Sequence, residues 1–319
     1  MEIRAIALNT PWDDLGKVPV FLESARRLAP RTIRVSITTP PPGEARGVLE
    51  ELRDMGVEYV ALGEYGGGDL LELVEELDAF AVITSPDRYV SLLGELERRG
   101  RPELARNIAL SLGGIAYNSP YYPATAVNDR GVSISLLYPD DLRTIGDVAA
   151  ALKRGASIGE SLAFAIGEKL LGVDGSLSPW GEASVAKAVE RLFGVRVGEW
   201  GTHSAIRAIN EAIWASGAPL VGFSEVMLPL AEDEGLKELA RSGELGLRDL
   251  VSYSAVCVAG VDMVPLEFEP RALRRLLADL EALAKTKGRP IGVRVFPASG
   301  EEFDVPGFGK TPVLKLGAR

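Results

Sequence analysis

The chain has 319 residues, of which 46% are hydrophobic and 25% charged, and its formal net charge is −10. This composition is typical of a soluble globular protein, and the acidic balance argues against binding to nucleic acid or to an anionic membrane, which requires clustered Lys and Arg. No apolar run approaches the ~18 residues of a bilayer span, and acids near the start interrupt the stretch that a signal peptide needs. We therefore expect a cytoplasmic protein.

Single cysteine and histidine residues limit the metal and redox chemistry. Cys257 is the only cysteine and His203 the only histidine, so an internal disulfide and a Cys/His zinc site are both excluded. Glutamine is absent whereas Arg and Glu are abundant. This pattern indicates a heat-adapted protein.

The first half of the chain alternates short apolar runs with amphipathic segments. We expect strands at 3–8, 32–37, 58–62, 79–83 and 132–136. Leucines at helical spacing, as in 70–77, predict helices between these strands, and such alternation is typical of a mainly parallel sheet. The loop before residue 132, which is rich in Gly, Pro and Tyr, is expected to be an insertion over an open face.

The second half continues the alternation, with expected elements at 140–170 (helix), 171–177 (strand), after 201–204 (helix), 219–223 (strand) and 270–286 (helix). Ser178 as N-cap and Pro179 at the first position predict a further helix start. No linker or repeat divides the chain, so we expect one domain, 1–319, with halves at about 1–138 and 139–319. About ten strands with crossover helices fit a closed α/β barrel or a wide doubly wound sheet.

Six motifs of the second half resemble, in order and spacing, the uncharacterised family called domain of unknown function 711. They are SLSP (176–179), GTHS (201–204), EDEG (232–235), CVAGVDM (257–263), VRVFP (293–297) and GKTPVLK (309–315). The resemblance implies a fold like that of pyruvate formate-lyase and other glycyl radical enzymes: an α/β barrel of about ten strands with a hairpin loop in its centre.

In those radical enzymes a thiol sits on the central hairpin, and the resemblance implies that the segment carrying Cys257 is its counterpart, with Gly260 and Pro265 as bends. Their radical is kept on a glycine in a short motif near the C-terminus. Pro297 stands at that place here, and a second cysteine is absent. We therefore expect no glycyl radical.

Cys257 and His203 form one candidate pair. A reactive thiolate needs a cation, a histidine or a helix N-terminus nearby, and the flanking valines supply none, so Cys257 is either a core residue or a thiol that His203 activates. His203 is expected at the start of a helix that Thr202 can cap. Because a helix N-terminus disfavours imidazolium, a neutral base is the consistent role, and simple capping geometry is the alternative.

Acidic residues form a second set of candidates. Asp262 lies in an apolar stretch, where a carboxylate must find a partner or a shifted pKa, so it is a candidate acid, base or ligand. Glu232 begins a run of three acids, but consecutive helical residues point in different directions and cannot all bind one ion. Acids that favour the dipole of a helix start are the alternative explanation.

Binding residues are predicted in two loops. The amides after the strand at 171–177, near Ser178, are placed to hold a carboxylate or phosphate, unless they form an ordinary helix start. The segment YNSPYYP contains Asn118 and Tyr121, whose aromatic and hydrogen-bonding groups suit a small polar ligand beneath a loop that covers a barrel mouth. Packing between subunits explains the same tyrosines equally well.

These observations favour a non-radical enzyme that acts on a small polar metabolite by acid/base or thiol chemistry. The catalytic candidates are His203, Cys257 and Asp262, and the binding candidates are Ser178, Thr202, Asn118, Tyr121 and Glu232. A metabolite-binding or regulatory protein without catalysis, and an enzyme that uses a divalent metal held by carboxylates, both stay open. We also expect a homo-oligomer.

Overall fold

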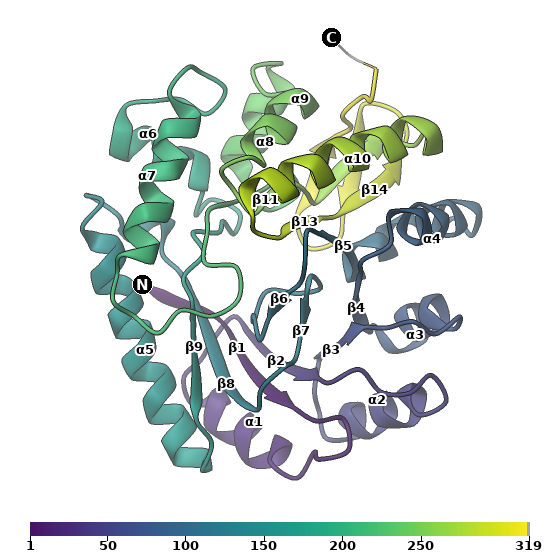
Figure 1. The fold of residues 1–319 in the computed structure, drawn as a ribbon, viewed down its shortest axis with the longest axis vertical. Coiled ribbons are helices and arrows are strands. Elements are labelled where there is room, and N and C mark those ends of the chain that lie inside the picture. Colours follow the sequence, from purple (N-terminus) through teal and green to yellow (C-terminus); the bar gives the residue numbers. More distant parts are fainter. Residues whose placement is uncertain (318–319) are drawn as a thin grey trace.

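The structure is a computed structural model that describes residues 1–317. It shows a mixed α/β protein in which helices surround a large sheet (Figure 1). The strands of this sheet are β1 (Glu2–Thr10), β2 (Thr32–Ile37), β3 (Tyr59–Glu64), β4 (Phe80–Ile83), β5 (Ile108–Leu112), β8 (Gly131–Leu137), β9 (Leu170–Asp174) and β13 (Ile291–Val293).

The sheet has the order β13-β5-β4-β3-β2-β1-β8-β9. Strands β1 to β5 run parallel to one another, as the alternation of strands and helices predicts. β8 is antiparallel to β1 and parallel to β9, and β13 is antiparallel to β5. The large sheet therefore has a parallel centre of five strands, with one antiparallel pairing on each side of it.

Four two-stranded sheets accompany the large one. They pair β6 (Ala116–Tyr117) with β7 (Thr125–Ala126), β10 (Met227–Pro229) with β11 (Ala259–Asp262), β12 (Val264–Glu267) with β14 (Val295–Ala298), and β15 (Glu302–Val305) with β16 (Gly309–Pro312). The backbone N–H of Met227 donates to Leu177, just after β9 (2.9 Å), and that of Gly292 in β13 donates to Val258, just before β11 (2.9 Å). The β10–β11 region thus has backbone hydrogen bonds with the segment after β9 and with β13.

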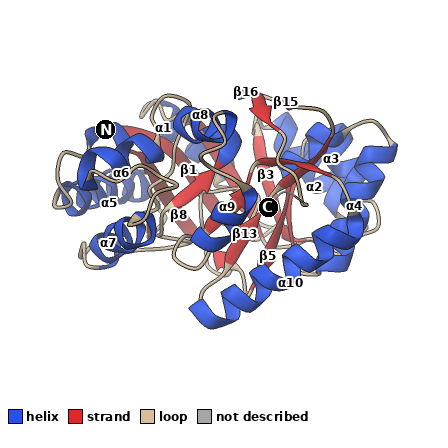
Figure 2. Ribbon diagram, turned by 90° about the horizontal axis from the view of Figure 1, so that it is seen from above, coloured by secondary structure: helices blue, strands red, loops and turns tan. Residues whose placement is uncertain are grey.

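Helices lie on the outside of the strands (Figures 1 and 2). They are α1 (Val18–Arg26), α2 (Ala45–Asp54), α3 (Leu70–Leu77), α4 (Pro86–Arg98), α5 (Asp147–Ile166), α6 (Val185–Phe193), α7 (Thr202–Trp214), α8 (Glu234–Arg241), α9 (Leu247–Tyr253) and α10 (Pro270–Lys287), with 3-10 turns η1 (Pro102–Asn107), η2 (Pro139–Asp141) and η3 (Leu230–Glu232). Among residues 1–317, no helix has both the length and the apolar character to cross a membrane.

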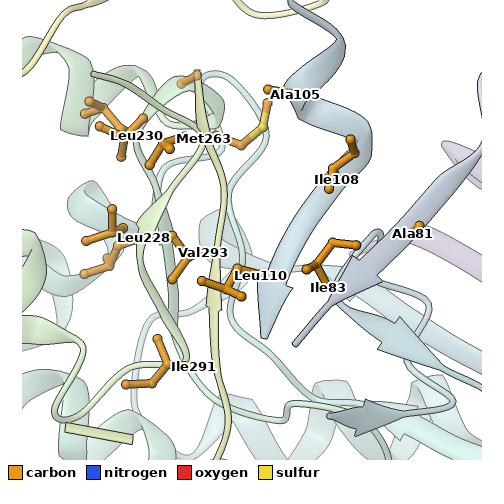
Figure 3. Close-up of a cluster of buried hydrophobic side chains, with 14 of the residues drawn as sticks. Ala81, Ile83, Ala105, Ile108, Leu110, Leu228, Leu230, Met263, Ile291 and Val293 are labelled. Atoms are coloured by element: carbon orange, nitrogen blue, oxygen red, sulfur yellow. The ribbon is translucent and has the colours of Figure 1, made fainter. Parts of the chain in front are cut away.

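The main core lies between strands and helices and follows the two-residue period of the strands. In β5, Ile108 and Leu110 belong to this core, and Figure 3 shows them beside Ile83 of β4 and Val293 of β13. Ala109, between them in sequence, belongs instead to a small cluster with Tyr121 and Phe223 on the other face of the sheet. The sheet therefore has two buried faces.

Several expected elements agree with the structure. The strand expected at 32–37 is β2, and the helix expected at 270–286 is α10, which ends one residue later. The strand expected at 219–223 is reduced to a single bridge between Leu220 and Val173.

The expected helix start at Ser178 is wrong. The backbone of Trp180 pairs with Ala183, and the N–H of Gly181 donates to the carbonyl of Glu232 (2.7 Å), so the chain stays irregular there. Helix α6 begins only at Val185, where Ser184 is the N-cap and accepts from the Lys187 N–H (3.1 Å). Pairing with a distant segment has overridden a local capping signal.

The expectation that Cys257 lies on a central hairpin is also wrong. Cys257 lies two residues before β11, which pairs in parallel with β10. The segment that lies in the middle of the view is 113–130, which carries β6 and β7 (Figure 1). Its strand β7 packs against β3 and β4.

Candidate functional site

A cavity of about 210 Å³ lies on the inner face of the strands. Residues of β1 to β5 form one side, the 113–130 segment contributes Tyr121 and Tyr122, and β10, β11 and β13 form the other side. Phe308, at the tip of the β15–β16 hairpin, packs against Trp180 at the cavity edge, with ring centroids 5.5 Å apart and ring planes tilted by 60°. The cavity is mostly apolar, with a few charged groups that converge on it.

Strand alternation places Arg34 in this cavity. Val35 and Ile37 of β2 pack under the helices, so Thr32 and Arg34 face inward. The Nε of Arg34 donates to Oγ1 of Thr32 (2.9 Å), and Nη1 donates to the carbonyl of Pro120 (2.7 Å). The guanidinium lies over the ring of Tyr122, 4.9 Å from its centroid.

A local irregularity places Arg4 in the same cavity. Ile6 and Leu8 of β1 pack under the helices, and regular alternation would send Arg4 there too. The pairing of β1 with β8 shifts register between Ile3 and Ala5, however, and such a bulge re-aims a side chain. Arg4 consequently lines the cavity, where it is 4% exposed.

Four charged residues form a buried network at one side of the cavity. Arg4 pairs with Glu232 (2.7 Å), and Glu232 also pairs with Arg294 (3.1 Å). Arg294 holds Asp262 with both ends of its fork, Nε to Oδ1 at 2.6 Å and Nη2 to Oδ2 at 2.7 Å. Two carboxylates thus share one guanidinium, and both face the cavity.

The two carboxyl groups of this network have different proton affinities. Burial raises the pKa of Glu232, but the charges of Arg4 and Arg294 outweigh it, so the net pKa is lowered. Burial also raises the pKa of Asp262, and since Arg294 is its one cationic partner and Glu232 repels it, the net pKa stays raised. Glu232 is therefore the more firmly ionised member, and Asp262 the one closer to accepting a proton.

A buried carboxylate behind the cavity anchors the 113–130 segment. Oδ2 of Asp174 accepts from Oγ of Ser119 (2.6 Å) and from the Phe223 N–H (2.9 Å). Oδ1 accepts from the Ser224 N–H (3.0 Å) and from Oγ of Ser176 (2.6 Å). One side chain thus ties together the inner segment, the end of β9 and the loop before β10.

Four of the predicted site residues line the cavity together: Tyr121, Ser178, Glu232 and Asp262. Burial raises the pKa of Tyr121 to about 12, so its hydroxyl stays protonated. Ser178 is 1% exposed, and its Oγ has no hydrogen-bond partner within residues 1–317. A buried hydroxyl without a partner at a cavity wall is a ready contact for a ligand.

The predicted pair of Cys257 and His203 is not brought together. Cys257 is fully buried, and burial raises its pKa to about 12, which keeps it a thiol. His203 is exposed, and its Nε2 shares a hydrogen bond with Oγ of Ser252 (2.9 Å). No hydrogen bond joins the two within the described chain, and neither lines the cavity.

Thr202 and Asn118 have structural contacts instead of cavity contacts. The prediction that Thr202 caps α7 is wrong, because its Oγ1 donates to the carbonyl of Glu199 (2.8 Å) and the N-cap position is Gly201. Asn118 braces the inner segment, since its Oδ1 accepts from the Asn128 N–H (3.1 Å).

Two carboxylates of the acidic run 232–234 already have partners within the protein, which limits their use as metal ligands. Asp233 is the N-cap of α8 and accepts from the N–H groups of Gly235 (2.9 Å) and Leu236 (3.2 Å), while Glu232 faces the arginines. No group of three or more His, Cys, Asp or Glu side chains with metal-binding geometry occurs in the described part of the chain.

Two arginines of the cavity, Arg34 and Arg294, were not predicted as site residues from the sequence. The signal for Arg34 lay in β2, where Thr32, Arg34 and Ser36 alternate with apolar residues, a pattern that equally describes a solvated face. Arg294 stands within the VRVFP motif, but the expectation drawn from that motif concerned Pro297 and not the arginine.

Comparison with known proteins shows similarity to one family. The model of the family described as Uncharacterised ACR (DUF711) matches residues 140–304, which is more than half of the chain. A UPF0210 protein of Pyrobaculum islandicum is 33% identical over 74% of this chain and 54% of its own length. UPF0210 proteins of Methanopyrus kandleri (28% identical, 74% of this chain, 53% of that protein) and Campylobacter concisus (26%, 93% and 66%) are also similar.

The chain spans between about half and two thirds of the length of these relatives. The family match runs from before α5 into β15 and includes Glu232, Asp262 and Arg294 of the charged network. The chain belongs to the family described as Uncharacterised ACR (DUF711).

Proposed function

We propose that this protein is an enzyme that binds a small molecule in the central cavity and acts on it by acid–base chemistry at Asp262. The observation that carries the proposal is the pair of carboxylates, Glu232 and Asp262, which share Arg294 at the cavity wall and whose pKa values shift in opposite directions. Environments that separate two carboxyl groups in this way are typical of acid–base sites.

We further infer that the cavity is the interior of a ten-stranded barrel of the kind implied by the resemblance to glycyl radical enzymes. The eight strands of the large sheet and the β10–β11 pair make ten, and the bonds from Met227 to Leu177 and from Gly292 to Val258 support a closed ring. In this arrangement the inner faces of strands from both halves of the chain meet around one ligand.

Each residue of the network has a distinct role in the proposal. Asp262 exchanges a proton with the ligand, and Arg294 orients it through two hydrogen bonds. Glu232 stays ionised and holds Arg4 and Arg294 in place. Tyr121 and Ser178 offer hydroxyl groups at the cavity wall. Cys257 and His203 have no part in this chemistry, because neither reaches the cavity.

The test is turnover of small metabolites by matched variants. The full chain is incubated with a cell extract freed of macromolecules, and mass spectrometry records which compounds disappear and which appear. We expect at least one conversion that Asp262→Asn abolishes and that Asp279→Asn, the same change on the exposed face of α10, leaves intact. Conversion at an equal rate by Asp262→Asn, or no conversion by the wild type, would refute the proposal.

A metabolite-binding protein without catalysis is the second candidate. It is favoured by the same ion pairs, since a carboxylate held by both ends of an arginine can serve only to shape a pocket. The two candidates separate in the turnover experiment, because a binding protein retains a compound without converting it.

A further inference from the structure

We infer that the ligand of this cavity is a small organic carboxylate, and that Arg34 binds its carboxylate group. The inference rests on the proposed function only in taking the cavity as the ligand site, and it does not depend on catalysis at Asp262. It follows from the position of Arg34, from its unused hydrogen-bond donors and from the charges around it.

Arg34 differs from the other arginines of the cavity in having no carboxylate partner. Arg4 pairs with Glu232, and Arg106 pairs with Asp78 (3.2 Å). Arg294 pairs with two carboxylates. No Asp or Glu within residues 1–317 forms an ion pair with Arg34, whose two hydrogen bonds go to the neutral oxygens of Thr32 and Pro120.

Three of the five N–H donors of this guanidinium are therefore free to bind a ligand. The positive charge also lacks full compensation: the net pKa of Arg34 is lowered to about 10, chiefly by burial, with Tyr122 opposing this shift, Arg4 adding to it and Glu232 opposing it more weakly. A half-buried cation without a counter-ion is less favourable than a solvated one, and an anionic ligand would reduce this cost. A charged residue in such a place is expected where the charge is retained for ligand binding and not for the stability of the fold.

The charge balance favours a single negative charge on the ligand. Arg4, Arg34, Arg106 and Arg294 are opposed by Glu232, by Asp262 and by Asp78, the partner of Arg106, which leaves one positive charge in excess at the cavity. A carboxylate neutralises this excess. A phosphate dianion would leave negative charge beside two carboxylates in an apolar cavity, and we regard this as the less favourable ligand class.

The shape of the site around Arg34 fits a flat group. The guanidinium lies 4.9 Å from the ring centroid of Tyr122 and 5.7 Å from that of Tyr59, and Phe80 packs between these two rings. A planar carboxylate matches the planar arginine fork and can lie among these rings. Beyond them, Phe223, Met227 and Val258 give the ligand body an apolar environment.

The cavity volume limits the size of the ligand. About 210 Å³ equals the liquid volume of roughly seven water molecules at ~30 Å³ each, and since bonded atoms of an organic molecule each need less, it accommodates on the order of ten non-hydrogen atoms. A nucleotide or a coenzyme A derivative exceeds this size. A monocarboxylic acid with a short apolar or aromatic body matches both the volume and the walls.

The experiment measures binding of defined probes to the full chain by calorimetry and by ligand-observed NMR. The probes are benzoate and phenylacetate, with benzamide as the uncharged isostere of benzoate and phenyl phosphate as the dianionic competitor. We expect benzoate or phenylacetate to bind at least about tenfold more tightly than benzamide and than phenyl phosphate. Failure of both carboxylates to bind at 10-millimolar concentration, on the order of the weakest specific affinities, overturns the inference.

Variants locate the binding group. Arg34→Gln should weaken carboxylate binding at least about tenfold, and Arg34→Lys should weaken it less, because it keeps the charge but loses the fork. Arg275→Gln, on the exposed face of α10, should bind like the wild type. Unchanged binding by a folded Arg34→Gln protein, tighter binding of phenyl phosphate, or equal binding of benzamide overturns the inference.

Failure of this inference and of the proposed function give different results. Carboxylate binding that requires Arg34, in a protein that converts no metabolite, removes catalysis and keeps the inference. Metabolite conversion that requires Asp262, with no dependence of carboxylate binding on Arg34, does the reverse.

Discussion

Replacement of Arg294 by methionine tests whether the charged network is organised as described. Methionine approximates the length of the arginine side chain but removes the charge that Glu232 and Asp262 share. Both carboxylates would then face each other in a buried site, with only Arg4 left as a cationic partner. Breaking a buried ion pair in this way destabilises a protein by about 3–5 kcal/mol.

This loss should depend on pH, with a sign that follows from the pKa shifts. Without Arg294, burial and mutual repulsion raise the pKa values of Asp262 and Glu232 in the folded state above their unfolded values of about 4. A group whose folded pKa is raised costs stability above that pKa, and the cost disappears as the pH falls toward the unfolded value. The variant should therefore be much less stable than wild type at pH 7.5 and closer to it at pH 4.5.

Guanidinium chloride denaturation at the two pH values measures both effects. Arg274→Met is the control, because Arg274 pairs with Asp87 on the surface at 2.8 Å, and an exposed pair contributes at most ~1 kcal/mol. Adding Asp262→Asn to Arg294→Met should recover part of the lost stability, since it removes one of the two opposed charges. A loss below about 1 kcal/mol at pH 7.5, or an equal loss at both pH values, would refute the described network.

Two further predictions concern residues outside the network. Cys257, fully buried with a pKa raised to about 12, should not react with a thiol reagent at pH 8 until the protein is unfolded, and rapid labelling of the native protein would contradict the buried position. Gly222→Ala should destabilise by more than about 2 kcal/mol, because φ is +68° and the new Cβ would collide with Asp174 and Ser119. Thermal unfolding compared with Gly243→Ala, where φ is +78° and the space is open, separates the collision from the backbone cost.

Local pattern was sufficient for much of the fold. In β2, three apolar residues alternate with polar ones over six positions, and the strand was predicted with its observed ends. In α10, leucines recur at helical spacing, and Gly288 in a left-handed conformation follows the last turn. The spacing indicates the helix, and the glycine marks its end. These elements are determined by their own residues, which is why sequence alone suffices for them.

Elements determined by distant contacts were predicted less well. Ser178 followed by Pro179 has the pattern of a helix start, yet Gly181 pairs with the backbone of Glu232, more than 50 residues away. The inward position of Arg4 likewise depends on a register shift against β8. Neither contact has a signature in the neighbouring residues, so local pattern could not predict them.

The site residues also differ in whether local sequence or distant contacts determine their position. Asp262 was identified because a carboxylate in an apolar stretch requires a partner, and Glu232 because it begins an acidic run; both are local arguments. Arg34 was missed because a polar position on a strand reads as a solvated one unless the other face of the sheet is known to be enclosed. What encloses it is the 113–130 segment, with Pro120 accepting from Arg34 and Tyr122 stacking beneath it.

The enclosure depends in turn on a residue that does not touch the cavity. Asp174 accepts hydrogen bonds from Ser119, Ser176, Phe223 and Ser224, so the inner segment is held to the end of β9 and to the loop before β10 by one carboxylate. The guanidinium of Arg34 is half-buried against this segment, through its contacts with Pro120 and Tyr122. The polar contacts of Asp174, which lie outside the cavity, hold the segment against which Arg34 is placed without a counter-ion. Such an arrangement is expected when a site is preorganised for an anionic ligand.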